Sequence, residues 1–127
     1  MLAWSIAYVG ILVWISALAQ HINNLAVHGT KWVTSDRSQA IPEDGFTGRS
    51  TRTLRNNLES AAMYVPIALV ALTMNEHSPI VTWTATIYMV ARTTFTLGYW
   101  TKINAVRSLS WLVGMICIAV LAVSLPR

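Results

Sequence analysis

Four apolar segments, separated by polar connections, run along the chain. They predict helices over about residues 1–28, 47–74, 79–100 and 107–125. Each contains close to the roughly 20 apolar residues that a helix needs to cross about 30 Å of hydrocarbon. The pattern predicts an all-α fold, an integral membrane four-helix bundle, in a single domain over residues 1–127 with no residues left for a separate soluble domain.

Composition and charge agree with this interpretation and add an orientation. Hydrophobic residues make up 54% of the chain and charged residues 11%, which is typical of a membrane protein. Basic residues gather in the first and third connections and are missing from the second, and such basic loops stay on the cytoplasmic side. We therefore expect a multi-pass protein with both termini periplasmic or lumenal. The net charge of +4 comes from these loops and gives no indication of nucleic-acid binding.

A polar stripe marks the start of the second segment. Arg52, Arg55, Asn56 and Glu59 are spaced at i, i+3, i+4 and i+7, which places their side chains on one face of a helix. Glu59 stands at the edge of the hydrocarbon, where an unpaired charge is costly. Arg92 of the third segment is expected at a similar depth, so we predict a buried pair of Glu59 and Arg92, either in direct contact or bridged by water or a ligand.

The third segment carries a stripe of its own, formed by Arg92, Thr96 and Tyr99 at i, i+4 and i+7. Two stripes at one depth imply that they face each other or share a cleft that opens to the cytoplasm. These polar groups could simply tie the helices together. However, the arginines of these segments outnumber Glu59, and surplus arginine at a cleft indicates an anionic ligand.

These motifs resemble a known family. The run Arg-x-x-Arg-Asn-x-x-Glu from residue 52 to 59, the run Arg-x-x-x-Thr-x-x-Tyr from residue 92 to 99, and the pair Arg107-Ser108 are similar to the signature of the MAPEG proteins, the membrane-associated proteins in eicosanoid and glutathione metabolism. The resemblance implies a homotrimer of four-helix subunits. It also implies that glutathione binds between neighbouring subunits, near the cytoplasmic side.

The resemblance further implies a set of site residues, which are Arg52, Arg55, Asn56, Glu59, Arg92, Thr96, Tyr99, Arg107 and Ser108. Glu59 would take the amino group of the tripeptide, and the arginines of the second segment would take its carboxylates. Arg92 would pair with Glu59 and line the pocket, while Tyr99 would hydrogen-bond the peptide. Arg107 and Ser108 would lie near the sulfur, where an arginine can stabilise the nucleophilic thiolate.

More than one function stays open. The first hypothesis is a glutathione-dependent transferase or peroxidase that acts on lipophilic electrophiles entering from the bilayer. Trp111 stands where catalytic members often have an aromatic hydroxyl or an arginine, so a non-catalytic lipid-binding or accessory subunit, or a structural partner in a larger membrane complex, is the alternative. The three histidines form no metal-binding motif, and no metal is predicted.

Overall fold

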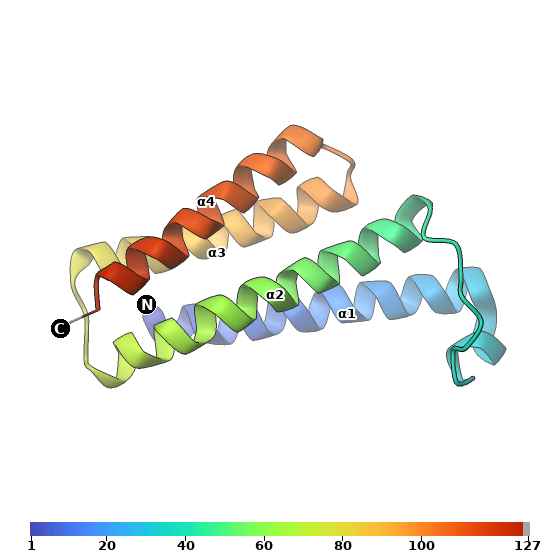
Figure 1. Ribbon diagram of the computed structural model, residues 1–127, viewed down its shortest axis with the longest axis horizontal. Helices are drawn as coiled ribbons and strands as arrows, with labels where there is room; N and C mark the ends of the chain where they lie inside the picture. The colour runs from blue at the N-terminus through green and yellow to red at the C-terminus, as the bar shows by residue number, and fades with distance from the viewer. Residues whose placement is uncertain (126–127) are drawn as a thin grey trace.

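The computed structural model describes residues 1–125, which fold into four helices (Figure 1). α1 spans Leu2–Val33, α2 spans Gly45–Thr73, α3 spans Pro79–Trp100 and α4 spans Asn104–Val123. No strand occurs between residues 1 and 125, so the predicted all-α class is confirmed. The predicted domain also included residues 126 and 127, which lie outside the described part of the chain.

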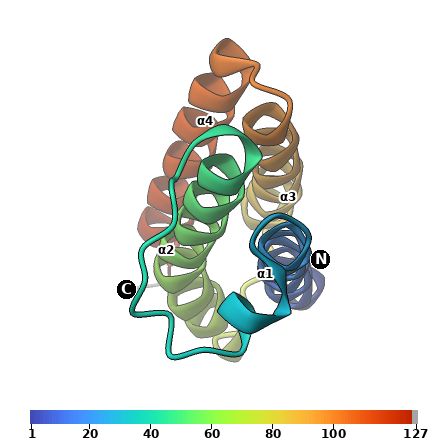
Figure 2. The same ribbon diagram turned by 90° about the vertical axis from the view of Figure 1, so that its right-hand side faces the viewer.

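The helices form two antiparallel pairs, α1 with α2 and α3 with α4 (Figure 1). The N-terminus and the α2–α3 connection lie at one end of the molecule, and the α1–α2 and α3–α4 connections lie at the other. Viewed from this second end, the last turn of α1 runs away from the axis of its own helix (Figure 2). The bend occurs at Gly29, whose φ of 78° is readily adopted by glycine.

Two helix boundaries differ from the prediction by three residues or more, and the others agree within two residues. α1 continues to Val33 instead of ending near residue 28, because the chain bends at Gly29 and then resumes helical geometry. α4 begins at Asn104 instead of residue 107. The early start of α4 places Arg107 within its first turn.

The surface of the bundle is apolar. Two of the helices, α1 and α4, are long and apolar enough to cross a membrane. Large apolar side chains on different helices are exposed, among them Trp4, Trp83, Leu109 and Val123. Soluble proteins seldom expose apolar surface on this scale, and these features together indicate a membrane protein.

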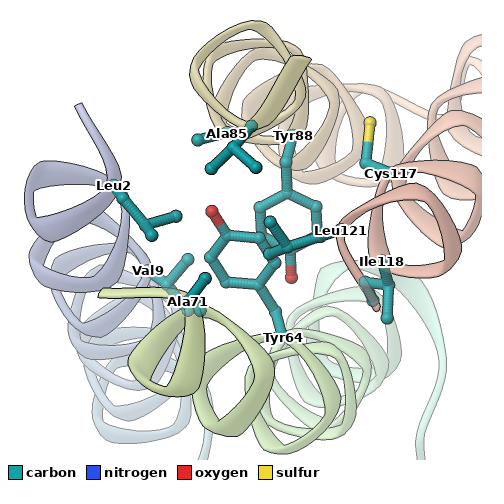
Figure 3. Close-up of a cluster of buried hydrophobic side chains, with 11 residues drawn as sticks. Leu2, Val9, Tyr64, Ala71, Ala85, Tyr88, Cys117, Ile118 and Leu121 are labelled. Atoms are coloured by element: carbon teal, nitrogen blue, oxygen red, sulfur yellow. The ribbon is translucent and has the colours of Figure 1, made fainter. Parts of the chain in front are cut away.

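The interior, in contrast, contains paired polar groups. The rings of Tyr64 on α2 and Tyr88 on α3 are stacked with their centroids 3.8 Å apart at the centre of the bundle (Figure 3). The Tyr64 hydroxyl is hydrogen-bonded to Ser5 Oγ, and the Tyr88 hydroxyl to Ser60 Oγ, each at 2.6 Å. Because each hydroxyl has a partner, the rings can be fully buried without leaving a polar group unsatisfied.

A tight turn joins α3 to α4. The Ile103 N–H donates to the Gly98 carbonyl at 2.9 Å, and Lys102 adopts a φ of 64°. A Cβ at Gly98 would lie 3.1 Å from both Arg107 N and Val106 Cγ1. The missing side chain at Gly98 therefore lets the start of α4 approach the end of α3, and this approach positions Arg107.

Candidate functional site

A cleft of about 630 Å³ lies between α2, α3 and α4. Arginine, carboxylate, amide and hydroxyl groups line one part of it, and apolar side chains line the rest. Its wall is formed by Arg52, Arg55, Asn56, Glu59, Phe95, Tyr99, Arg107, Ser108, Trp111 and Leu112. The structure thus brings seven of the nine predicted site residues together from three helices, while Arg92 and Thr96 are missing from the wall.

The α2 side of the cleft is the polar stripe. Arg52, Arg55 and Glu59 are exposed and Asn56 is half-buried, because residues at this spacing share the face of α2 that points away from the core. Arg52 Nε donates a hydrogen bond of 3.2 Å to the Tyr99 hydroxyl. This bond connects the α2 wall to the α3 wall across the cleft.

The α1–α2 connection reaches the edge of the cleft at Glu43. A carboxylate oxygen of Glu43 lies 4.0 Å from Arg52 Nη1, and both side chains are about half exposed, so water weakens this ion pair. The backbone contact nearby is closer. A Cβ at Gly48 would lie 2.1 Å from the Glu43 carbonyl oxygen, which means that the connection lies directly against α2 only because Gly48 has no side chain.

The α4 side of the cleft carries Arg107. Its guanidinium carbon lies 5.0 Å from the centre of the Tyr99 ring, a favourable cation–π distance. Arg107 Nε is buried and has no hydrogen-bond partner within residues 1–125. Ser108 follows it on the cleft wall and is exposed. A partly desolvated cation beside an exposed hydroxyl is suited to an anionic group of a ligand.

The direct contact predicted between Arg92 and Glu59 is wrong. Arg92 is only 3% exposed, and its Nη2 donates to Asn56 Oδ1 at 2.9 Å and to Asn57 Oδ1. Within the described residues Glu59 forms no ion pair with Arg92 and lies on the wall of the cleft. Two amide oxygens thus satisfy the buried guanidinium in place of a carboxylate.

Asn57, which the sequence analysis missed, connects three helices behind the cleft. Its amide nitrogen donates to Ser16 Oγ on α1 at 2.8 Å and to Thr96 Oγ1 on α3 at 3.1 Å, while its oxygen accepts from Arg92. Thr96 is 2% exposed and belongs to this buried network, so it contributes to the site through its neighbours.

The sequence did contain a signal for this network. A second set of polar residues on α2 repeats at helical spacing and is entirely buried, and it consists of Thr53, Asn57, Ser60 and Tyr64. α2 therefore has one polar stripe on the cleft side and another on the core side. The sequence pattern does not show which of the two stripes binds Arg92.

The family comparison agrees with the geometry of the cleft. The model of the MAPEG family matches residues 1–125 of the chain, nearly its whole length. The chain belongs to the MAPEG family. No curated protein and no solved structure gives a match. The MAPEG family includes glutathione transferases and related proteins.

In this MAPEG protein apolar side chains line the cleft together with the arginines. Phe95, Trp111 and Leu112 line the cleft, and the Trp111 side chain is 43% exposed. An indole offers a flat apolar surface and one N–H donor, but it has no acidic hydroxyl that could donate a proton. The cleft can therefore hold an amphipathic ligand, with its charged groups near the arginines and its apolar part against Phe95, Trp111 and Leu112.

No group of three or more histidine, cysteine or carboxylate side chains suited to a metal ion occurs in the part of the chain that is described. The chemistry of the cleft in this MAPEG protein consequently rests on arginine, carboxylate, amide and hydroxyl groups.

Proposed function

We propose that this protein is a membrane-bound, glutathione-dependent transferase or peroxidase that acts on lipophilic electrophiles. The balance of charge in the cleft carries the proposal. Arg52, Arg55 and Arg107 offer positive charge and Glu59 offers negative charge. Glutathione in its thiolate form has a pair of carboxylates, a thiolate and a single ammonium group, so each charged group of the ligand has a complementary partner in the cleft.

The proposed binding mode follows the polarity of the walls. Arg52 and Arg55 bind the carboxylates, because guanidinium groups form charge-assisted and often bidentate hydrogen bonds with carboxylates. Glu59 binds the ammonium group. Tyr99, whose hydroxyl accepts from Arg52, hydrogen-bonds the peptide.

Arg92 and Thr96 act from behind the cleft in this proposal. The bond from Arg92 occupies Asn56 Oδ1, which leaves the amide N–H groups of Asn56 to face the ligand as donors. Thr96 accepts from Asn57 and so holds the second amide against Arg92. Both residues belong to the site as positioning residues, and neither needs to touch the ligand.

Arg107 stabilises the reactive sulfur. A positive charge within about 4–6 Å lowers the pKa of an ionisable group by roughly one to three units when the charged form is the anion. Arg107 would therefore raise the thiolate fraction of bound glutathione near neutral pH, with Ser108 beside the sulfur. The thiolate is the nucleophile that attacks an electrophilic carbon or a peroxide oxygen.

The apolar wall indicates the class of the second substrate. Phe95, Trp111 and Leu112 border the same cleft as the arginines. Trp111 and Leu112 are also exposed on the apolar exterior of α4, which would give a molecule dissolved in the bilayer a direct route to the sulfur.

The proposed assembly and orientation extend the same argument. All four helices cross the membrane, both termini are periplasmic or lumenal, and the cleft opens to the cytoplasm, where glutathione is abundant. Three subunits associate, so that neighbouring copies cover the exposed part of the α2 stripe.

A second candidate is a non-catalytic lipid-binding or accessory subunit on the same scaffold, alone or in a larger membrane complex. One observation favours it, which is Trp111 at a position where a hydroxyl or arginine would assist proton transfer. Such a protein would keep the arginines for binding and lose turnover.

Calorimetric titration of glutathione into the detergent-solubilised protein, combined with the ultraviolet absorbance of the thiolate, tests the proposal. Arg55→Leu should weaken binding by about ten- to a hundredfold, since a hydrogen bond to a charged group contributes roughly 1.5–3 kcal/mol. Arg107→Leu should largely retain binding and lose the thiolate signal. Arg49→Leu is the matched control, because Arg49 lies on α2 outside the cleft wall and packs on Phe46.

The outcomes separate the two candidates. Binding with a thiolate signal and turnover of an aryl halide or a lipid hydroperoxide supports the enzyme. Glutathione binding without a thiolate signal and without turnover favours the accessory subunit. A wild-type protein that binds no glutathione contradicts the glutathione proposal altogether.

A further inference from the structure

A second cavity, separate from the cleft, lies at the bend of α1. The helix breaks at Gly29 and its last turn, ending at Val33, runs across the end of the bundle together with the α1–α2 connection (Figure 2). This cavity has a volume of about 420 Å³. We call it the elbow site, and it is lined by His28, Lys31, Trp32, Ser35, Gln39 and Ile41.

The elbow site is rich in hydrogen-bond donors. His28 Nε2 is buried and has no hydrogen-bond partner in the described chain, while Lys31 is exposed beside it. The Trp32 indole N–H donates to the Gln39 carbonyl at 2.9 Å, which holds the connection over the last turn of α1. The Arg37 guanidinium carbon lies 5.7 Å from the centre of the Trp32 ring and adds a second positive charge.

The carboxylate that is closest in the sequence, Asp36, does not neutralise this site. Asp36 Oδ1 accepts a hydrogen bond of 3.0 Å from the Ser38 backbone N–H, and Asp36 is not part of the cavity wall. The two positive charges of Lys31 and Arg37 exceed the single negative charge of Asp36. The elbow site therefore has a local surplus of positive charge.

Its position along α1 corresponds to the surface of a bilayer. The helix from Leu2 to His28 is about 40 Å long at 1.5 Å per residue, and a bilayer with its headgroups is about 40–45 Å thick. Exposed apolar side chains continue along this helix as far as Val27, which is 61% exposed. The polar elbow begins at the next residue, where the lipid-facing surface ends.

We propose that the elbow site binds the phosphate of an anionic phospholipid headgroup. Lys31 supplies the positive charge, and the unpartnered His28 Nε2 supplies a ring donor. Trp32 lies at the depth where tryptophan is enriched in membrane proteins. Basic residues next to a membrane helix attract anionic lipids, so all of these features favour binding of an anionic headgroup. The proposal does not depend on glutathione or on catalysis.

The thermal unfolding midpoint of the detergent-solubilised protein provides the test. Short-chain phosphatidylglycerol should raise the midpoint more than phosphatidylcholine with the same acyl chains or inorganic phosphate at the same concentration. Lys31→Gln should weaken the apparent affinity for phosphatidylglycerol by roughly fivefold, because a basic residue near an anionic lipid surface contributes about that factor. Lys31→Arg should retain the response.

Lys102→Gln is the matched control, since Lys102 is an exposed lysine at the same end of the molecule, in the α3–α4 connection. It should respond like the wild type. His28→Ala removes a donor and keeps both Lys31 and Arg37, and it should also reduce the response, which keeps the proposal testable if Lys31→Gln does not fold.

Three results would overturn the proposal. Equal losses in Lys31→Gln and Lys102→Gln would point to general surface charge. If phosphatidylcholine raised the unfolding midpoint as much as phosphatidylglycerol does, the charge of the headgroup would not matter. If inorganic phosphate raised it as much, the cavity would be a site for small anions and not for a lipid.

Discussion

Two adjacent asparagines in α2 have different roles: we expect Asn56 to serve ligand binding and Asn57 to serve the stability of the fold. Asn56 lines the cleft and Asn57 is 2% exposed behind it, and both accept hydrogen bonds from Arg92. Successive helical residues are rotated by about 100°, so one amide faces the cleft while the next faces the core. Arg92 lies at the boundary between the two faces and can serve both.

Asn57→Ala should lower the free energy of unfolding by about 2–4 kcal/mol, because the buried groups of Arg92, Ser16 and Thr96 all lose a partner. Chemical unfolding in detergent measures this loss. Asn56→Ala is the neighbouring control and should cost less stability while weakening glutathione binding. Equal destabilisation by the two variants would contradict this division.

Residue spacing in the sequence predicted which side chains share a helix face, and the structure brings seven of the nine predicted residues into one cleft wall. The partner of Arg92 was wrong for a physical reason. A guanidinium can donate to a carboxylate or to amide oxygens, and which of them it meets depends on how α2 is rotated against α3. That rotation is set by core contacts such as the Tyr64–Tyr88 stack, which helical spacing does not specify.

The α3–α4 hairpin is the element that sets the geometry of the cleft. Its turn is short, Gly98 contacts the start of α4, and Arg107 follows within the first turn of that helix. The apolar pattern predicted both helices, but it did not predict the early start of α4, because Asn104, Arg107 and Ser108 interrupt the apolar pattern before Leu109.

Gly98→Ala should push α4 away from α3, since its Cβ would lie 3.1 Å from Arg107 N. We expect a loss of about 1–3 kcal/mol in unfolding free energy, as for other overpacked sites. The displacement of Arg107 should also reduce the thiolate absorbance of bound glutathione.

Gly10→Ala provides the matched glycine control. Gly10 lies within α1, where an added Cβ meets no atom within 4 Å. This variant should be neutral or more stable by up to about 1 kcal/mol, because alanine is a better helix former than glycine. A Gly98→Ala protein with the stability and the thiolate signal of Gly10→Ala would refute the proposed role of the turn.

At the scale of the whole molecule, the charged stripe of α2 is incompletely covered by the subunit. Arg55 and Glu59 are exposed, and the small residue Ala62 lies on the same side of the helix, one turn further on. Polar groups in a membrane seek partners away from lipid, and small residues permit close approach of a neighbouring helix. This arrangement favours self-association through α2.

Native mass spectrometry in mild detergent should report three subunits. Ala62→Trp should shift the population towards smaller species, because a large side chain blocks close helix approach. Ala3→Trp is a control on the exposed face of α1 near the N-terminus and should leave the mass unchanged. A fully helical wild-type monomer or dimer would contradict trimerisation.

The contact between Gly48 and the Glu43 carbonyl divides the α1–α2 connection into a part that is free to vary and a part that is anchored. Before Ile41 the connection is bound to the last turn of α1 through the Trp32–Gln39 hydrogen bond, so extra residues inserted near Ser38 would alter the elbow site and leave the cleft in place. After Ile41 the chain is held against α2, and an insertion there would shift the residues that precede the cleft. Grafted tags or fluorescent labels are therefore compatible with a working protein when they are attached around residue 38, and incompatible with it a few residues later.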